Sequence, residues 1–156
     1  MVRALTLGAA VIGWLIINPA FAADSIRPDR NLTPGAFYDD ITQAQICTSG
    51  YSKRERHTSA KLKRRVFLQY GIDKNKGHYE VDHLIPLSLG GADEKDNLWP
   101  ESYDTQPWNA SVKDRLEDWL HTEVCSGRVP LAVAQAEFAN DWIVAYQKYL
   151  GDPAAW

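Results

Sequence analysis

The chain has 156 residues, of which 45% are hydrophobic and 24% are charged, and its formal net charge is −3. This length corresponds to one domain of ordinary size, so the sequence excludes a large multidomain protein. The composition is that of a folded globular protein and excludes a disordered chain, which would be less hydrophobic and more highly charged.

The first 22 residues are expected to be a secretory signal peptide rather than part of the fold. Arg3 precedes an uncharged apolar stretch over residues 4–17, and the small-residue pattern Ala20-Phe21-Ala22 follows it. A basic start, a short apolar core and an A-x-A site are the three parts of such a signal. The stretch is shorter than the roughly 20 residues that span a bilayer, although a retained anchor is the alternative. We therefore expect cleavage after Ala22, a single mature domain over residues 23–156 without membrane contact, and a periplasmic or secreted location.

The chain contains only two cysteines, Cys47 and Cys125. An even and minimal cysteine count in an exported chain predicts one disulfide, because the compartments beyond the inner membrane are oxidising. Closing a loop of about 78 residues would stabilise the fold by ~4 kcal/mol in the chain-entropy model. The alternative is a pair of buried free thiols.

The first half of the mature chain is expected to contain little regular structure before one helix. Residues 23–40 carry prolines and a glycine without apolar periodicity, which predicts an extended lead-in. Residues 41–46 predict a short helical turn, and residues 47–51 predict a loop held by the disulfide. A helix is expected between an N-cap at Thr58 and a C-cap at Gly71, with an apolar stripe formed by Leu62, Val66 and Tyr70.

The second half changes from strand to helix patterns. Residues 78–86 are rich in β-formers, and a long loop with Gly90-Gly91 separates them from a short apolar return at Leu98-Trp99. Helical periodicity then predicts one helix from Pro107 to Gly127 and a last helix from Pro130 to Gly151. The pattern predicts an α+β fold with two short strands and mainly helical surroundings.

One group of residues has spacing that indicates a catalytic module. In chain order these are Asp82, His83, Pro86, Gly90, Gly91, Asn97 and Asn109. This pattern resembles the HNH endonuclease family, whose ββα-metal module has a strand ending in Asp-His, a glycine-containing loop, an Asn on the second strand and a ligand on the following helix. The resemblance covers about 48 residues, with a ββα core at about residues 77–124. It implies that a ββα-metal module is embedded in a small, mainly helical domain.

The resemblance implies a role for each motif residue. His83 would be the general base, since an imidazole with a pKa near its usual value of about 6.5 is largely neutral at pH 7. Asp82 and Asn109 would hold a divalent cation, and oxygen ligands favour Mg²⁺, with Mn²⁺ as the second choice. Asn97 would tie the loop backbone together and thereby orient His83.

The sequence departs from the commonest family pattern at the third position, where many members have a histidine. Asn109 makes this chain an H-N-N variant, which leaves the metal identity open. An asparagine at a helix start is often only a cap, so Asp104 is an alternative ligand. Glu80 shares strand parity with Asp82 and is a secondary candidate. Asp82 could also orient His83 without touching a metal.

A basic segment precedes the motif. Residues 53–65 carry seven cations against the single acid Glu55, so the segment has a net charge of 7 − 1 = +6. Such a surface is typical of proteins that bind a phosphate backbone, although a solvated helix face is the alternative. Lys113, one turn after Asn109, is expected to add a phosphate contact. The proposed nucleic-acid-binding residues in the segment are Lys53, Arg54, Arg56, Lys61, Lys63, Arg64 and Arg65.

Together these features predict an exported, metal-dependent HNH endonuclease that cuts DNA with little sequence preference, because no base-reading module is evident. RNA is left open as a second substrate, and a monomer is expected. The alternative is a non-catalytic nucleic-acid-binding protein that uses residues 53–65. A disulfide-stapled interaction protein without a nucleic-acid role is the third interpretation.

Overall fold

The computed structural model describes residues 26–155, and the predicted signal peptide lies outside them. The described chain combines helices with one antiparallel pair of strands, which confirms the expected α+β class. Among residues 26–155, no helix is long and apolar enough to cross a membrane. In chain order the elements are α1 (Gln43–Ile46), α2 (Tyr51–Glu55), α3 (Ala60–Tyr70), β1 (Tyr79–His83), β2 (Leu98–Ser102), α4 (Ala110–Cys125) and α5 (Leu131–Leu150).

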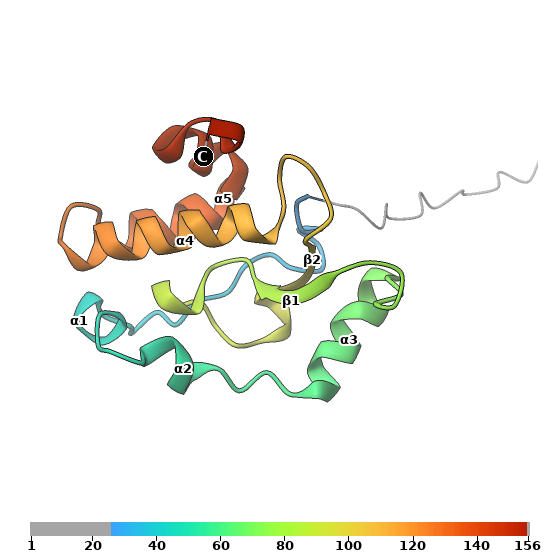
Figure 1. Cartoon of the computed structure of the whole chain (residues 1–156). Helices are drawn as coiled ribbons and strands as arrows, with labels where there is room; N and C mark the ends of the chain where they lie inside the picture. The colour runs from blue at the N-terminus through green and yellow to red at the C-terminus, as the bar shows by residue number, and fades with distance from the viewer. Residues whose placement is uncertain (1–25, 156) are drawn as a thin grey trace, which may run out of the picture.

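The two strands form the centre of the fold. β1 and β2 pair in an antiparallel register that places Asp82 opposite Trp99 and Glu80 opposite Glu101. Because side chains alternate along a strand, these four residues share one face of the pair. α4 and α5 lie on one side of the strand pair in Figure 1 and α3 lies on the other.

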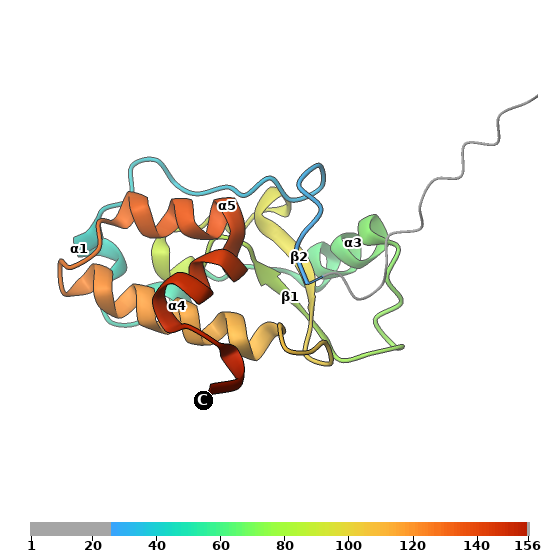
Figure 2. The same ribbon diagram turned by 90° about the horizontal axis from the view of Figure 1, so that it is seen from above.

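Two apolar cores hold these layers together. The larger core joins α1, α4 and α5, where residues such as Leu116, Leu120 and Phe138 are fully buried. Seen from above, α5 runs alongside α4 over much of its length (Figure 2). The smaller core joins α3 to the strands through Val66, Leu98 and their neighbours. The periodic stripes of the sequence are therefore the faces that the helices bury.

Helix ends follow local sequence signals, with two differences from expectation. α3 is capped by Ser59, whose hydroxyl accepts the Leu62 N–H at 3.1 Å, rather than by Thr58. Gly71 ends α3 in the left-handed region at φ 65°, as expected, since glycine adopts that conformation at little cost. α5 is interrupted at Asp141, whose φ of −163° and ψ of 104° are not helical.

The N-terminal part is more helical than expected at one point. Residues 47–51, predicted as a loop, include the start of α2 at Tyr51. The disulfide between Cys47 and Cys125 is confirmed, with the two Cα atoms 5.6 Å apart. It joins the end of α1 to the end of α4, which are 78 residues apart in sequence.

Candidate functional site

His83 lies at the end of β1, with its ring against a carboxylate that the sequence analysis did not select. Nε2 of His83 lies 2.8 Å from Oδ1 of Asp93, and only 2% and 4% of these two side chains are exposed. Asp93 also accepts the His57 N–H at 2.5 Å and the Thr58 hydroxyl. Burial alone would raise the pKa of Asp93, but the hydrogen bonds from Thr58, His83 and His57 lower it below its usual value. Asp93 is therefore an ionised acceptor that ties three separate donors together.

This contact determines what His83 can do. An ionised carboxylate only accepts, so Nε2 of the neutral imidazole carries the hydrogen and Nδ1 carries the lone pair. Burial lowers the pKa of His83, the charges of Asp82 and Asp93 raise it, and the net shift is downward. The imidazole is therefore neutral at pH 7 and able to accept a proton at Nδ1.

Asn97 ties the loop between the strands, as the resemblance implied. Its amide oxygen accepts the Ile85 N–H at 2.9 Å, and its amide nitrogen donates to Ile85 O at 2.8 Å and to Ala92 O at 3.0 Å. The side chain is fully buried. Gly91 makes this close packing possible, since a Cβ there would lie 1.8 Å from the Ile85 carbonyl oxygen. The Asn97 side chain thus makes three hydrogen bonds to the loop that follows His83.

Lys113 does not take the role expected of it. Its ammonium is fully buried and donates to Asp82 Oδ2 at 2.5 Å, to Glu117 Oε1 at 2.5 Å and to His83 O at 2.9 Å. The prediction that Lys113 contacts a phosphate is wrong, because the ammonium faces the strand pair and not the solvent. Neighbouring carboxylates raise the pKa of Lys113 well above its usual value despite its burial, so it stays charged.

Three acidic side chains surround the Lys113 ammonium. We call Asp82, Glu101 and Glu117 the carboxylate cluster. Glu101 Oε2 lies 4.0 Å from the Lys113 Nζ atom, and Glu101 is 2% exposed. Glu101 also lies against Asp82, and the two carboxyl groups share a side-chain hydrogen bond. Burial raises the pKa of Glu117 to about 8 and raises that of Glu101 well above its usual value, whereas Lys113 holds the pKa of Asp82 low.

Two members of the carboxylate cluster were missed by the sequence analysis, although weak signals existed. Glu101 lies two residues after the short apolar return Leu98-Trp99, and Glu117 lies four residues after Lys113 on the same helix face. Neither signal is specific without the strand register. The cluster offers oxygen donors, which are the ligands that Mg²⁺ and Mn²⁺ prefer, and the Lys113 ammonium already contacts two of its three carboxylates.

The remaining ligand candidates are engaged in other contacts. Asn109 caps α4, with its amide oxygen accepting the Val112 N–H at 3.1 Å, which is the alternative that the sequence left open. Asp104 is exposed and accepts the backbone N–H of His78 at 2.9 Å. Glu80 shares the face of Asp82 as expected, and burial raises its pKa.

The middle of the basic segment lies beside the candidate site. All seven of its predicted nucleic-acid-binding side chains are exposed, on α2, on α3 and on the linker between them. Arg56 directly precedes His57 and Thr58, which both donate to Asp93, so the linker is anchored beside His83. A cationic surface and a neutral imidazole therefore adjoin one another.

These contacts bring a neutral imidazole and an ionised carboxylate together beside a cationic linker. The imidazole has a fixed hydrogen-bond partner, Asp82 lies next to it in the chain, and exposed cations surround the linker. No protein-family model, curated protein or solved structure matches this chain. The functional assignment therefore depends on the sequence motif and on the contacts described above.

Proposed function

We propose that this protein is an exported, metal-dependent endonuclease of the HNH type that hydrolyses DNA phosphodiester bonds with little sequence specificity. The observation that carries the proposal is the buried contact between His83 and Asp93, 2.8 Å long, beside Asp82. The order of a strand ending in Asp82-His83, a loop tied by Asn97, a second strand and a helix supports it as well. This is the order of elements in the ββα-metal module that the sequence resembles.

His83 acts as the general base in the proposed reaction. Its Nδ1 atom takes a proton from the attacking water, while Asp93 holds the hydrogen on Nε2 and keeps the ring in one orientation. The imidazolium that forms is stabilised by the ionised Asp93 carboxylate. Asn97 keeps the loop after His83 in place and so maintains the position of the ring.

Asp82 and Asn109 are the proposed ligands of a divalent cation. The side chains around Asp82 offer oxygen atoms, which suit Mg²⁺, and the cation would have to displace the Lys113 ammonium from Asp82 Oδ2. Asn109 would share its amide oxygen between the cation and the helix cap. When bound, the cation would supply positive charge to the phosphate and to the leaving oxygen.

The Asp93→Asn variant is expected to cut DNA on the order of 10- to 100-fold more slowly, the usual effect of losing the partner that orients a histidine. An amide presents a donor on one side, so at least one of the three donors that now meet Asp93 would face another donor. Asp93→Leu removes both acceptor oxygens, and in that variant the ¹⁵N spectrum of His83 should lose the pure Nε2–H tautomer. Asp96→Asn, in the same acidic turn, is the control and should change neither the rate nor the spectrum. An unchanged tautomer in Asp93→Leu would contradict the role given to Asp93.

The basic segment is expected to bind phosphates through charge alone. Replacing Lys61, Arg64 and Arg65 with alanine should weaken DNA binding and reduce the slope of log affinity against log salt by roughly 0.9 for each phosphate that is no longer neutralised. Fluorescence anisotropy with a labelled duplex at several salt concentrations measures both quantities. Lys148→Ala on α5 is the control, and an equal effect there would show that only net charge matters.

Cleavage of plasmid DNA by residues 23–156 tests the function directly. We expect nicking in Mg²⁺ and in Mn²⁺ and none in EDTA. DNA that is bound but not cut in either metal would favour the second candidate, a non-catalytic nucleic-acid-binding protein, which the exposure of all seven basic side chains would also suit. If the protein neither binds nor cuts DNA, the remaining interpretation is a disulfide-stapled interaction protein.

A further inference from the structure

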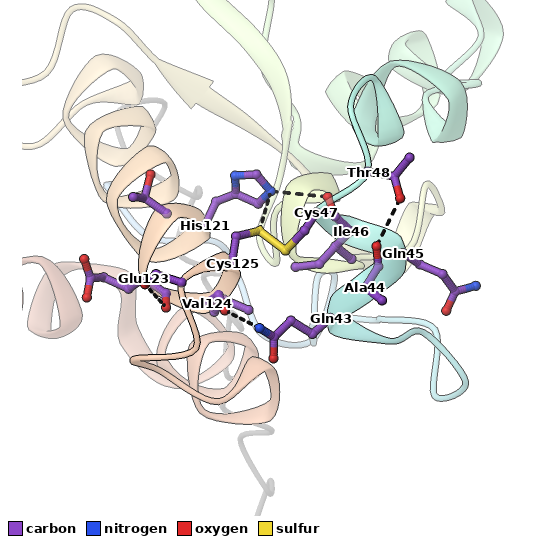
Figure 3. The surroundings of a disulfide bond; sticks show 12 residues. Gln43, Ala44, Gln45, Ile46, Cys47, Thr48, His121, Glu123, Val124 and Cys125 are labelled. Carbon is purple, nitrogen blue, oxygen red and sulfur yellow. Dashed lines mark hydrogen bonds between the residues drawn. A yellow bond between two sulfur atoms is a disulfide. The ribbon is translucent and has the colours of Figure 1, made fainter.

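The junction of α1 with α4 brings together three side chains that are good zinc ligands. Cys47 caps the C-terminus of α1, and His121 and Cys125 lie four residues apart on one face of α4. Their ligand atoms all lie within 4.8 Å of one another. Figure 3 shows the His121 ring pointing at the disulfide, with Nε2 3.5 Å from Cys125 Sγ. No sequence motif includes His121, whose ring is directed at the disulfide.

Contacts other than the disulfide also hold α1 against α4. The Gln43 side chain donates to Val124 O at 2.7 Å, and His121 Nε2 lies 3.3 Å from Ile46 O (Figure 3). Ile46 is buried in the same core as Leu120 and Val124. These contacts do not depend on the sulfur–sulfur bond, so they keep the two cysteine side chains close together after it is broken.

Two thiolates and one imidazole form a typical zinc donor set, with a water completing a tetrahedral site. With zinc–sulfur distances of about 2.3 Å, the two sulfur atoms need to lie only about 3.8 Å apart in a tetrahedron. Solvent reaches this junction because the cysteines are only partly buried. We propose that reduction of the disulfide converts the junction into a Zn²⁺ site formed by Cys47, His121 and Cys125.

The redox step balances with a dithiol as reductant. The bond between the two cysteine sulfurs breaks, the dithiol closes into its own disulfide, and its two electrons and two protons pass to Cys47 and Cys125. Zn²⁺ then displaces the two thiol protons and binds Nε2 of His121, whose hydrogen moves to Nδ1. The contact of Nε2 with Ile46 O is given up. In a reducing compartment zinc would therefore connect α1 to α4, as the disulfide does in an oxidising one.

Cobalt(II) is the probe that tests this site, since only thiolate ligation produces an intense near-ultraviolet charge-transfer band. The purified protein is reduced with a water-soluble phosphine, which becomes a phosphine oxide by taking the oxygen of water, and is then titrated with Co²⁺ under anaerobic conditions. We expect a thiolate band that saturates at about one Co²⁺ per chain and disappears when Zn²⁺ is added. The oxidised protein should show no such band, even if cobalt binds to carboxylates elsewhere. A reduced wild-type chain without the band would overturn the proposal.

The part played by the imidazole is tested with matched histidine variants. His121→Ala should weaken Zn²⁺ binding by the reduced protein on the order of 100-fold, because one of three protein ligands is removed. His78→Ala removes a ring with an 85% exposed side chain and should leave the affinity unchanged. Equal affinities in wild type and His121→Ala would exclude His121 from the site. Circular dichroism of the oxidised variants checks their folding, and the comparison of reduced with oxidised wild type decides the proposal without any variant. None of these readouts requires nuclease activity.

Discussion

Replacing His83 with alanine is expected to lower the rate of DNA cleavage by about 100- to 10,000-fold, which is the usual contribution of a general base. No other imidazole is expected to replace the His83 ring, because the contact between this ring and Asp93 is almost inaccessible from solvent. DNA affinity should stay within about two-fold of wild type, since the exposed cations of the basic segment are untouched. Single-turnover nicking of a plasmid measures the rate, and anisotropy measures the affinity.

His57→Ala provides the matched control for this variant. His57 is exposed, and only its backbone N–H contacts Asp93, so removing its ring leaves that hydrogen bond in place. His83→Gln serves as a second variant that keeps a polar side chain in the buried position. If His83→Ala and His83→Gln both cut DNA at the wild-type rate, His83 is not the base and the proposed mechanism fails.

Replacing Asn97 with alanine is expected to cost about 3 kcal/mol or more of unfolding free energy. The change leaves Ile85 N, Ile85 O and Ala92 O without their side-chain partner in a buried loop, and each such group costs roughly 1–3 kcal/mol. A domain of this size has only about 5–15 kcal/mol in total, so the midpoint of urea unfolding should fall markedly.

The control for this prediction is an exposed asparagine. Asn75 bonds only to Asp73 in a surface turn, so Asn75→Ala should change stability by no more than about 0.5 kcal/mol. Asn97→Asp keeps the acceptor for Ile85 N but loses both donated bonds, so it should be at least as destabilising as the alanine. A loss below about 1 kcal/mol in Asn97→Ala would mean that the loop is held by other contacts.

Local features of the fold were readily predicted from the sequence. The apolar stripes identified the buried faces of α3, α4 and α5, and Gly71 and Gly151 end two of these helices where expected. Caps and stripes depend on residues within one or two turns, so a single sequence contains the information needed to find them. The pairing of Cys47 with Cys125 followed because the chain has no other cysteine.

The candidate site was predicted only in part. Asp82, His83 and Asn97 come from one short motif. The hydrogen bonds from the Asn97 side chain to the loop match what that motif implied. Asp93 was not selected, since nothing in the spacing distinguishes it from the other acids of its turn. Lys113 was predicted to contact a phosphate, because basic residues are usually exposed and the sequence does not show how many carboxylates face it.

The sequence by itself determined the two strands, the three longest helices, their order and buried faces, and the motif residues of the proposed nuclease site, because each of these depends on near neighbours in the chain. Only the tertiary structure decided which charges meet: Lys113 reaches Asp82 across 31 residues, and Asp93 reaches Thr58 across 35. Such pairs form where strand register and helix packing bring distant side chains into one poorly solvated space, and an ionised group there must find a partner. The need for a partner follows from the loss of solvation, but the residue that supplies it depends on the whole fold.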